Sequence, residues 1–212
     1  MNRAWRIVAL PLLGAALTLA PAASAQTRRV TGIEIGTVLG YGKAQLTGQE
    51  SGRLRLGGAY FGFTVGIPVA GPIGFEPQLV LTRKGGELGQ AFAAQGFLAD
   101  QVYIELPVLA RVRIGGGDFG FRLFAGPAPA LRLGCDVQRL VASDSTRPTC
   151  GQLLVASSDL ELGIVYGAGI DIRAGSIILR AEARLVDGRR VIGPAGSGIR
   201  NRQWVGAVGF SF

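Results

Sequence analysis

Eight segments of the chain alternate between apolar side chains and polar, charged or glycine residues. A period of two sends successive side chains to opposite faces, which is the pattern of a β-strand with one apolar face. In residues 101–114, for example, Val102 and Ile104 lie on the face opposite Tyr103 and Glu105. The eight segments span residues 33–41, 56–69, 73–84, 101–114, 119–127, 159–173, 176–186 and 203–212. The alternation therefore predicts an all-β fold of eight strands.

The connections between these segments alternate in length. Short turns are expected at 69–72, 115–118 and 173–176, and long polar loops over about 42–53, 86–100, 134–157 and 187–201. Short turns at one end and long loops at the other are typical of barrels in the bacterial outer membrane. We predict an eight-stranded antiparallel up-and-down transmembrane β-barrel over residues 26–212, with both mature termini on the periplasmic side.

The N-terminal residues 1–25 have the three parts of a secretory signal peptide. Arg3 and Arg6 precede an apolar stretch over residues 7–20, and the small-residue tripeptide Ala-Ser-Ala ends at Ala25. The apolar stretch is shorter than the roughly 20 residues that a membrane-spanning helix needs. We therefore expect cleavage after Ala25 and export of the mature chain.

The chain is basic, with a formal net charge of +8 that falls to +6 when the two signal-peptide arginines are removed. Basic surfaces bind nucleic acids or anionic membranes. Because an exported chain meets lipid head groups first, we expect outer-membrane lipids as its surroundings and no nucleic-acid partner.

The faces opposite the apolar residues carry charges of both signs. In a soluble barrel or sandwich these charged faces would point to solvent, with the apolar faces forming the core. The glycines of these strands lie on the charged faces, as expected if those faces point into a narrow eight-stranded lumen. Buried charges are tolerated when they pair, so a lumen ion-pair network is predicted. Its expected members are Glu105, Arg111, Arg113, Arg122, Asp171, Arg180, Glu182 and Arg184.

The two cysteines, Cys135 and Cys150, lie in a polar stretch of the sequence. An even cysteine count in an exported protein favours a disulfide, which would stabilise the fold by roughly 3 kcal/mol in the chain-entropy model. A metal site is the alternative. It is disfavoured because two thiols in a chain without histidine make a poor ligand set.

Several stretches resemble the PorT-like family of outer-membrane β-barrel proteins over roughly residues 30–212. They are "LVLTRKGGEL", "VYIELPVLARVRI", "FRLFAGPAPALRL", "DLELGIVYGAGIDI" and "NRQWVGAVGFSF", in this order. The resemblance implies an eight-stranded barrel in the outer membrane and little about activity, although one branch is linked to protein secretion. It also implies that the ending Trp204, Val208, Phe210 and Phe212 is a signal for the outer-membrane barrel assembly machinery. The cysteine stretch is not part of the family pattern.

Motifs for catalysis are mostly absent. A chain without histidine cannot form a Ser-His or His-metal site. Asp159 and Glu161 could serve acid–base chemistry, but on a charged lumen face ion pairing is favoured. Residues 167–172 resemble half of a dinucleotide loop, yet they lack its third glycine and lie in a strand pattern. We therefore expect no catalytic residues, no cofactor and no metal.

Three classes of function remain open. We favour a small non-enzymatic barrel, monomeric, that stabilises the outer membrane or presents its loops to a partner. Arg189, Arg190 and Arg200 could contact the phosphates of lipopolysaccharide, or they could be solvated loop residues. The alternatives are a narrow small-solute channel or secretion-associated accessory barrel, and an enzyme with a carboxylate or serine site at the external rim.

Overall fold

The computed structural model describes residues 32–48, 51–88, 97–139, 159–191 and 198–212. These residues form nine β-strands. The strands are β1 (Glu34–Thr47), β2 (Ser51–Ala70), β3 (Ile73–Leu88), β4 (Phe97–Glu105), β5 (Val108–Ile114), β6 (Phe119–Arg139), β7 (Leu160–Ala174), β8 (Ile177–Gly188) and β9 (Arg200–Ser211). Within the described ranges, no helix has the length and apolar character that a membrane span requires.

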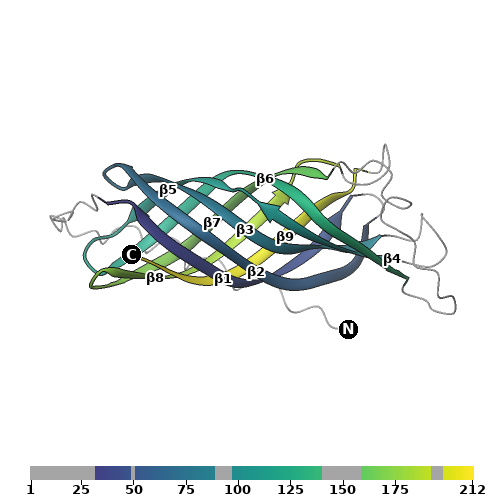
Figure 1. Ribbon diagram of the computed structural model, residues 1–212, viewed down its shortest axis with the longest axis horizontal. Helices are drawn as coiled ribbons and strands as arrows, with labels where there is room; N and C mark the ends of the chain where they lie inside the picture. The colour runs from purple at the N-terminus through teal and green to yellow at the C-terminus, as the bar shows by residue number, and fades with distance from the viewer. Residues whose placement is uncertain (1–31, 49–50, 89–96, 140–158, 192–197) are drawn as a thin grey trace, which may run out of the picture.

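The sheet closes on itself. Every pairing is antiparallel, and the first strand β1 pairs with both β2 and the last strand β9. The closure continues to the end of the chain, where Ile35 and Phe212 exchange two backbone hydrogen bonds of 3.0 Å. In Figure 1 the tilted strands wrap around one axis, and the C-terminus lies at the end with the short turns. The predicted eight-stranded antiparallel barrel is confirmed, because β4 and β5 together make one barrel strand.

The interruption between β4 and β5 falls at Pro107, which has no amide hydrogen to donate to the ladder. Both halves pair with β3 on one side and β6 on the other. Across the break, the Gln78 amide donates to the Pro107 carbonyl and the Leu106 amide to the Pro129 carbonyl, each at 2.8 Å. The proline therefore divides the strand without opening the barrel wall.

The strands extend further toward the loop end than the sequence predicted. The expected loop over 42–53 is wrong, since β1 continues to Thr47 and β2 begins at Ser51. β6 runs to Arg139 and β3 to Leu88, into the ranges expected to be loops. At this end the outer face is no longer strictly apolar, so alternation disappears while backbone pairing continues. The short turns are at the predicted positions, with Gly71 and Gly175 in the left-handed region at φ 54° and 64°.

The outer surface of the barrel is apolar. Large hydrophobic side chains that alternation placed on one face of each strand are exposed, including Phe63 at 53% and Leu123 at 50%. The closing strand shows the same pattern, since Trp204, Val208, Phe210 and Phe212 are all exposed. A continuous apolar exterior of this kind requires lipid around it. The barrel wall is therefore the membrane-spanning part of the molecule.

Candidate functional site

The interior of the barrel is polar and tightly filled. Inward-facing residues alternate with the lipid-facing ones, and most of the inward polar side chains are buried. They form two groups along the axis, which we call the arginine layer and the loop-end layer. The arginine layer consists of Glu34, Glu76, Arg111, Arg122, Asp171, Arg180, Glu182 and Arg184. The loop-end layer consists of Thr82, Lys84, Gln101, Tyr103, Glu105, Glu161, Asn201 and Gln203.

Glu76 of β3 is the centre of the arginine layer. Arg122 Nη1 donates to its two carboxylate oxygens at 3.0 and 2.8 Å. Arg111 Nη1 and Arg180 Nη1 each lie 3.3 Å from Glu76 Oε2. Glu76 is 1% exposed, so one fully desolvated carboxylate is surrounded by three guanidinium groups. Removing one member of such a cluster would leave an uncompensated charge inside the barrel.

The remaining carboxylates of the layer are also shared. Glu34 Oε2 accepts from Arg111 at 2.8 Å and from Arg180 at 2.7 Å. Glu182 accepts from both Arg122 and Arg184. Each acid therefore links at least two strands of the barrel through the arginines that it binds.

Arg184 closes the layer on the loop-end side. Its Nη1 donates to Gln78 Oε1 at 2.9 Å and also to the Tyr60 hydroxyl. The guanidinium carbon lies 5.0 Å from the centre of the Tyr60 ring and 5.3 Å from that of Phe124. These aromatic rings contribute cation–π attraction. They also fill the part of the lumen cross-section that the ion pairs do not occupy.

Glycines on the inner face make room for the arginines. A Cβ at Gly66 would lie 2.9 Å from both terminal nitrogens of Arg111, and a Cβ at Gly74 would lie 3.0 Å from its Nε. The Arg111 guanidinium thus occupies the volume of two missing side chains. The inner surface of an eight-stranded barrel is just wide enough for its side chains, which explains why the charged face is also the glycine-rich face.

The loop-end layer is less strongly basic. Lys84 pairs with Glu105, and both are fully buried. Glu161 Oε2 accepts from Asn201 Nδ2 at 3.0 Å, while Tyr103 donates to Gln101 at 2.7 Å. Gln203 Nε2 bonds to Thr82 Oγ1 at 3.1 Å. This second group of polar side chains fills the lumen above the arginine layer.

The structure separates the residues predicted for one lumen network. It brings Arg111, Arg122, Asp171, Arg180, Glu182 and Arg184 together in the arginine layer. Arg113 lies at the edge, with Nε 3.7 Å from Asp171 Oδ2. Glu105 lies instead in the loop-end layer, with Lys84. Sequence reasoning did not include Glu34 and Glu76, although both alternate with apolar residues and were identifiable as inward-facing.

Other predicted residues lie at the loop end. Cys135 is on β6, and Cys150 lies outside the described residues, so their disulfide stays a prediction. Asp159 pairs with Arg132 at 2.9 Å and is largely exposed, unlike the buried Glu161. The three arginines predicted as anion contacts differ in their surroundings. Arg190 Nη1 donates to the Leu160 carbonyl at 3.0 Å, and Arg189 Nε lies 3.8 Å from Asp187 Oδ2. Arg200 is exposed.

Free space inside the barrel is uneven. A void of only about 10 Å³ lies among Glu76, Arg122, Arg180 and Arg184. At the turn end, by contrast, a cavity of about 870 Å³ opens between the turns and ends on Arg111 and Arg122. In the part of the chain that the structure describes, no three His, Cys, Asp or Glu residues are grouped so that they could hold a metal.

A closed antiparallel barrel with an apolar exterior and a charged interior is an integral membrane β-barrel. The chain belongs to the family of the outer membrane protein beta-barrel domain, whose model matches residues 24–188. Membership of this family places the barrel in the bacterial outer membrane. Comparison with curated proteins finds no match.

Solved structures of other small barrels are similar to this chain. Ail of Yersinia pestis, solved in complex with the heparin analogue sucrose octasulfate, is 13% identical with a TM-score of 0.46, covering 85% of this chain and 99% of Ail. Neisserial surface protein A is 11% identical with a TM-score of 0.46, covering 85% and 97%. The N-terminal barrel of Pseudomonas aeruginosa OprF is 13% identical with a TM-score of 0.40, covering 84% and 97%.

Proposed function

We propose that the protein is a non-enzymatic outer-membrane barrel that does not conduct solutes and serves as a rigid membrane anchor for its loop end. The observation that carries this proposal is the arginine layer, in which Glu76 binds three guanidinium groups across the lumen. A cross-section filled by buried, paired side chains supports anchoring rather than transport.

The space left in this layer is too small for a water column. The void beside Glu76 measures about 10 Å³, which is about the least volume that holds a single water molecule. A permeating solute would have to break several ion pairs at once. A narrow small-solute channel is the second candidate, because the turn-end cavity gives solutes access as far as the arginine layer.

Within the family, we place the chain with the PorT-like barrels on the stretches that span β4, β5 and the closing strand β9. That placement makes an accessory role in protein secretion an alternative use of the same anchor. Genomic neighbourhood tests it, since genes for secretion components beside this one support the placement. Neighbours from unrelated pathways would contradict it.

The loop end faces the outside of the cell in this proposal, and the turn end faces the periplasm. Cysteine labelling on intact cells tests the orientation. With a membrane-impermeant maleimide, Arg200→Cys should label and Asp118→Cys should not, because Arg200 begins β9 at the loop end and Asp118 lies in a short turn. Both should label after lysis. The unsubstituted protein measures any reaction of Cys135 and Cys150, and labelling of Asp118→Cys on intact cells would reverse the proposed orientation.

We propose that Arg189, Arg190 and Arg200, which lie at the loop end beside β8 and β9, contact the phosphates of outer-leaflet lipopolysaccharide. Guanidinium groups bind phosphates bidentately, and Arg189 is partly exposed beside Asp187. Adding lipopolysaccharide to refolded barrel should raise its thermal stability, and replacing the three arginines with glutamine should remove most of that gain. An equal gain in thermal stability in the triple variant would show that the three arginines are solvated loop residues that do not bind lipopolysaccharide.

A further inference from the structure

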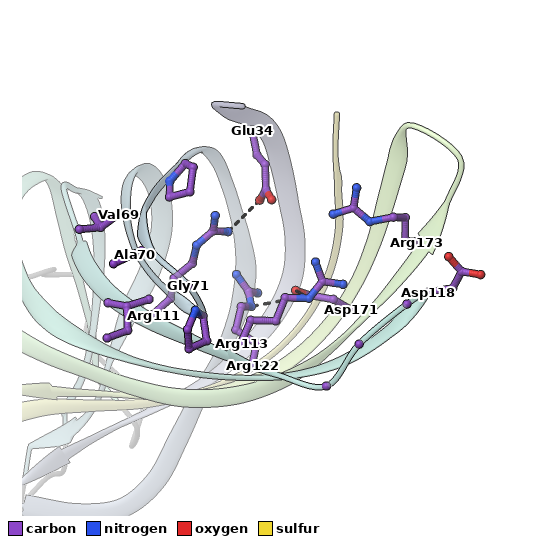
Figure 2. Close-up of a pocket in the computed structure, with 17 residues that line it drawn as sticks. Glu34, Val69, Ala70, Gly71, Arg111, Arg113, Asp118, Arg122, Asp171 and Arg173 are labelled. Atoms are coloured by element: carbon purple, nitrogen blue, oxygen red, sulfur yellow. Dashed lines mark hydrogen bonds and ion pairs between the residues drawn. The ribbon is translucent and has the colours of Figure 1, made fainter. Parts of the chain in front are cut away.

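The turn-end cavity, with a volume of about 870 Å³, is built from two strand turns and a ring of charged side chains. The turns contribute residues 68–74 and 115–118, and the charged residues that face the cavity are Glu34, Arg111, Arg113, Asp118, Arg122, Asp171 and Arg173. Figure 2 shows these side chains around the open space. A cavity of this volume is within the range of small-molecule sites.

The inner carboxylates of the cavity are already shared among arginines. Glu34 accepts from Arg111 and Arg180. Asp171 Oδ1 lies 3.6 Å from Arg122 Nε and 3.9 Å from Arg180 Nε, while its Oδ2 lies 3.7 Å from Arg113 Nε. The negative charge at the inner wall is therefore compensated, and the guanidinium groups nearest the opening determine what the cavity attracts.

Two of these guanidinium groups lack a close partner among the described side chains. Arg113 approaches Asp171 only to 3.7 Å, beyond hydrogen-bonding distance. Arg173 Nη2 is buried and makes no hydrogen bond. A buried donor without an acceptor, such as Arg173 Nη2, is costly, and both guanidinium groups border the same open space (Figure 2).

The strand register relates both arginines to Asp171. Gly120 of β6 pairs with Asp171 of β7, and a Cβ at Gly120 would lie 2.7 Å from Arg113 Nε. Arg113 of β5 therefore reaches across Gly120 toward Asp171. Arg173 follows Asp171 by two residues and lies on the same inner face, about 7 Å further along β7. Gly120 leaves the space through which Arg113 reaches Asp171, and Arg173 borders the same cavity.

We propose that the turn-end cavity binds a small soluble oxyanion, through a phosphate or carboxylate group held between Arg113 and Arg173. The planar forks of guanidinium groups match the two oxygens of such an anion and would satisfy the orphan donor of Arg173. The ligand comes from the aqueous side, because the barrel wall separates the cavity from the surrounding lipid and the cavity opens at the turn end.

Titration of the whole mature barrel in phosphatidylcholine nanodiscs tests the site. The signals of the arginine Nε–H groups are followed by NMR while inorganic phosphate, or acetate in a second arm, replaces chloride at constant ionic strength. We expect saturable shifts of the Arg113 and Arg173 signals. Arg173→Gln and Arg113→Gln should each weaken the apparent affinity at least about fivefold, since each removes a charge-assisted hydrogen bond.

Two further variants control for charge and for folding. Arg55→Gln removes the same charge from an exposed residue of β2 toward the opposite end of the barrel and should leave the affinity unchanged. Asp118→Asn should strengthen binding about two- to threefold, because it removes a repelling charge at the rim. Arg173→Gln and Asp118→Asn break no side-chain hydrogen bond or ion pair of the described residues, so they decide the outcome if Arg113→Gln does not fold.

Three results would overturn the proposal. The first is a linear shift of the arginine signals without saturation by either anion. The second is a loss of affinity in Arg55→Gln equal to that in Arg173→Gln. The third is movement of the two signals when phosphatidylglycerol replaces part of the nanodisc lipid in the absence of phosphate, which would identify a lipid head group in place of a soluble ligand.

Discussion

At the scale of the residue, the interior depends on carboxylates that each bind more than one arginine. Glu182 shows the dependence clearly, because it is buried and contacts both Arg122 and Arg184. Removing one partner of a buried ion pair leaves an uncompensated charge, which costs far more than the pair itself contributes relative to apolar packing.

We predict that Glu182→Ala lowers the free energy of unfolding by about 3–5 kcal/mol, since two guanidinium groups lose a partner inside the barrel. Asp159→Ala is the matched control. It also removes a carboxylate that pairs with an arginine, but Asp159 is largely exposed, so its loss should cost no more than about 1 kcal/mol. The measurement is the urea midpoint of refolded protein. A small change for Glu182→Ala at an unaltered slope would indicate a hydrated lumen and favour the channel.

At the scale of the element, the closing seam between β1 and β9 joins the ends of the chain. Its two strands approach closely where Gly40 pairs with Ala207. A Cβ at Gly40 would lie 2.5 Å from the Gly206 carbonyl oxygen and 2.7 Å from the Ala207 Cβ. Backbone atoms of a closed barrel cannot move aside, so the position excludes side chains.

We expect Gly40→Ala to destabilise the barrel by about 1–3 kcal/mol, as overpacking of a filled interior does. Gly206→Ala, one strand away, is the matched control, because a Cβ there meets nothing within 4 Å. It should be neutral or slightly stabilising. Thermal unfolding followed by gel mobility compares the two variants, and equal effects would show that the seam accommodates a side chain at position 40.

Sequence alternation predicts which residues point inward. It does not predict where each strand ends or which residues meet across the lumen. It placed Val102 and Glu105 on opposite faces, and the structure shows Val102 exposed on the outside and Glu105 buried inside, because a period of two depends only on the local backbone. It did not find the end of β6 at Arg139, since pairing there is maintained by backbone hydrogen bonds without an apolar face. It grouped Glu105 with the arginines, whereas register and stagger between strands bring it to Lys84. Contacts across the lumen depend on register, which alternation does not determine.

At the scale of the whole molecule, the barrel must first be assembled in the membrane. Phe212 ends the chain with its side chain exposed to lipid, and its backbone exchanges two hydrogen bonds with Ile35. We predict that deleting Phe212 reduces folded protein in the outer membrane much more than it reduces stability after refolding in detergent. Heat-dependent gel mobility of membrane fractions, compared with the detergent refolding yield, measures both.

Two variants separate recognition by the assembly machinery from loss of those hydrogen bonds. Phe212→Ala keeps the backbone pairing with Ile35 and should show the same membrane defect as the deletion. Phe61→Ala removes a lipid-facing ring from β2 and should be inserted normally. Normal amounts of heat-modifiable barrel in the membrane after the deletion would contradict recognition of Phe212 by the assembly machinery. Phe212 would then be an ordinary residue of the membrane interface.

The proposed function requires that the arginine layer close the whole cross-section of the barrel. Planar-bilayer recording of the refolded mature protein, with a porin as the positive control, tests it most directly. We predict no ohmic conductance steps from the wild type, because the arginine layer closes the cross-section and its void measures only about 10 Å³. Reproducible ohmic steps from the wild type, lost when the protein is heat-denatured before reconstitution, would contradict a sealed barrel and establish a channel.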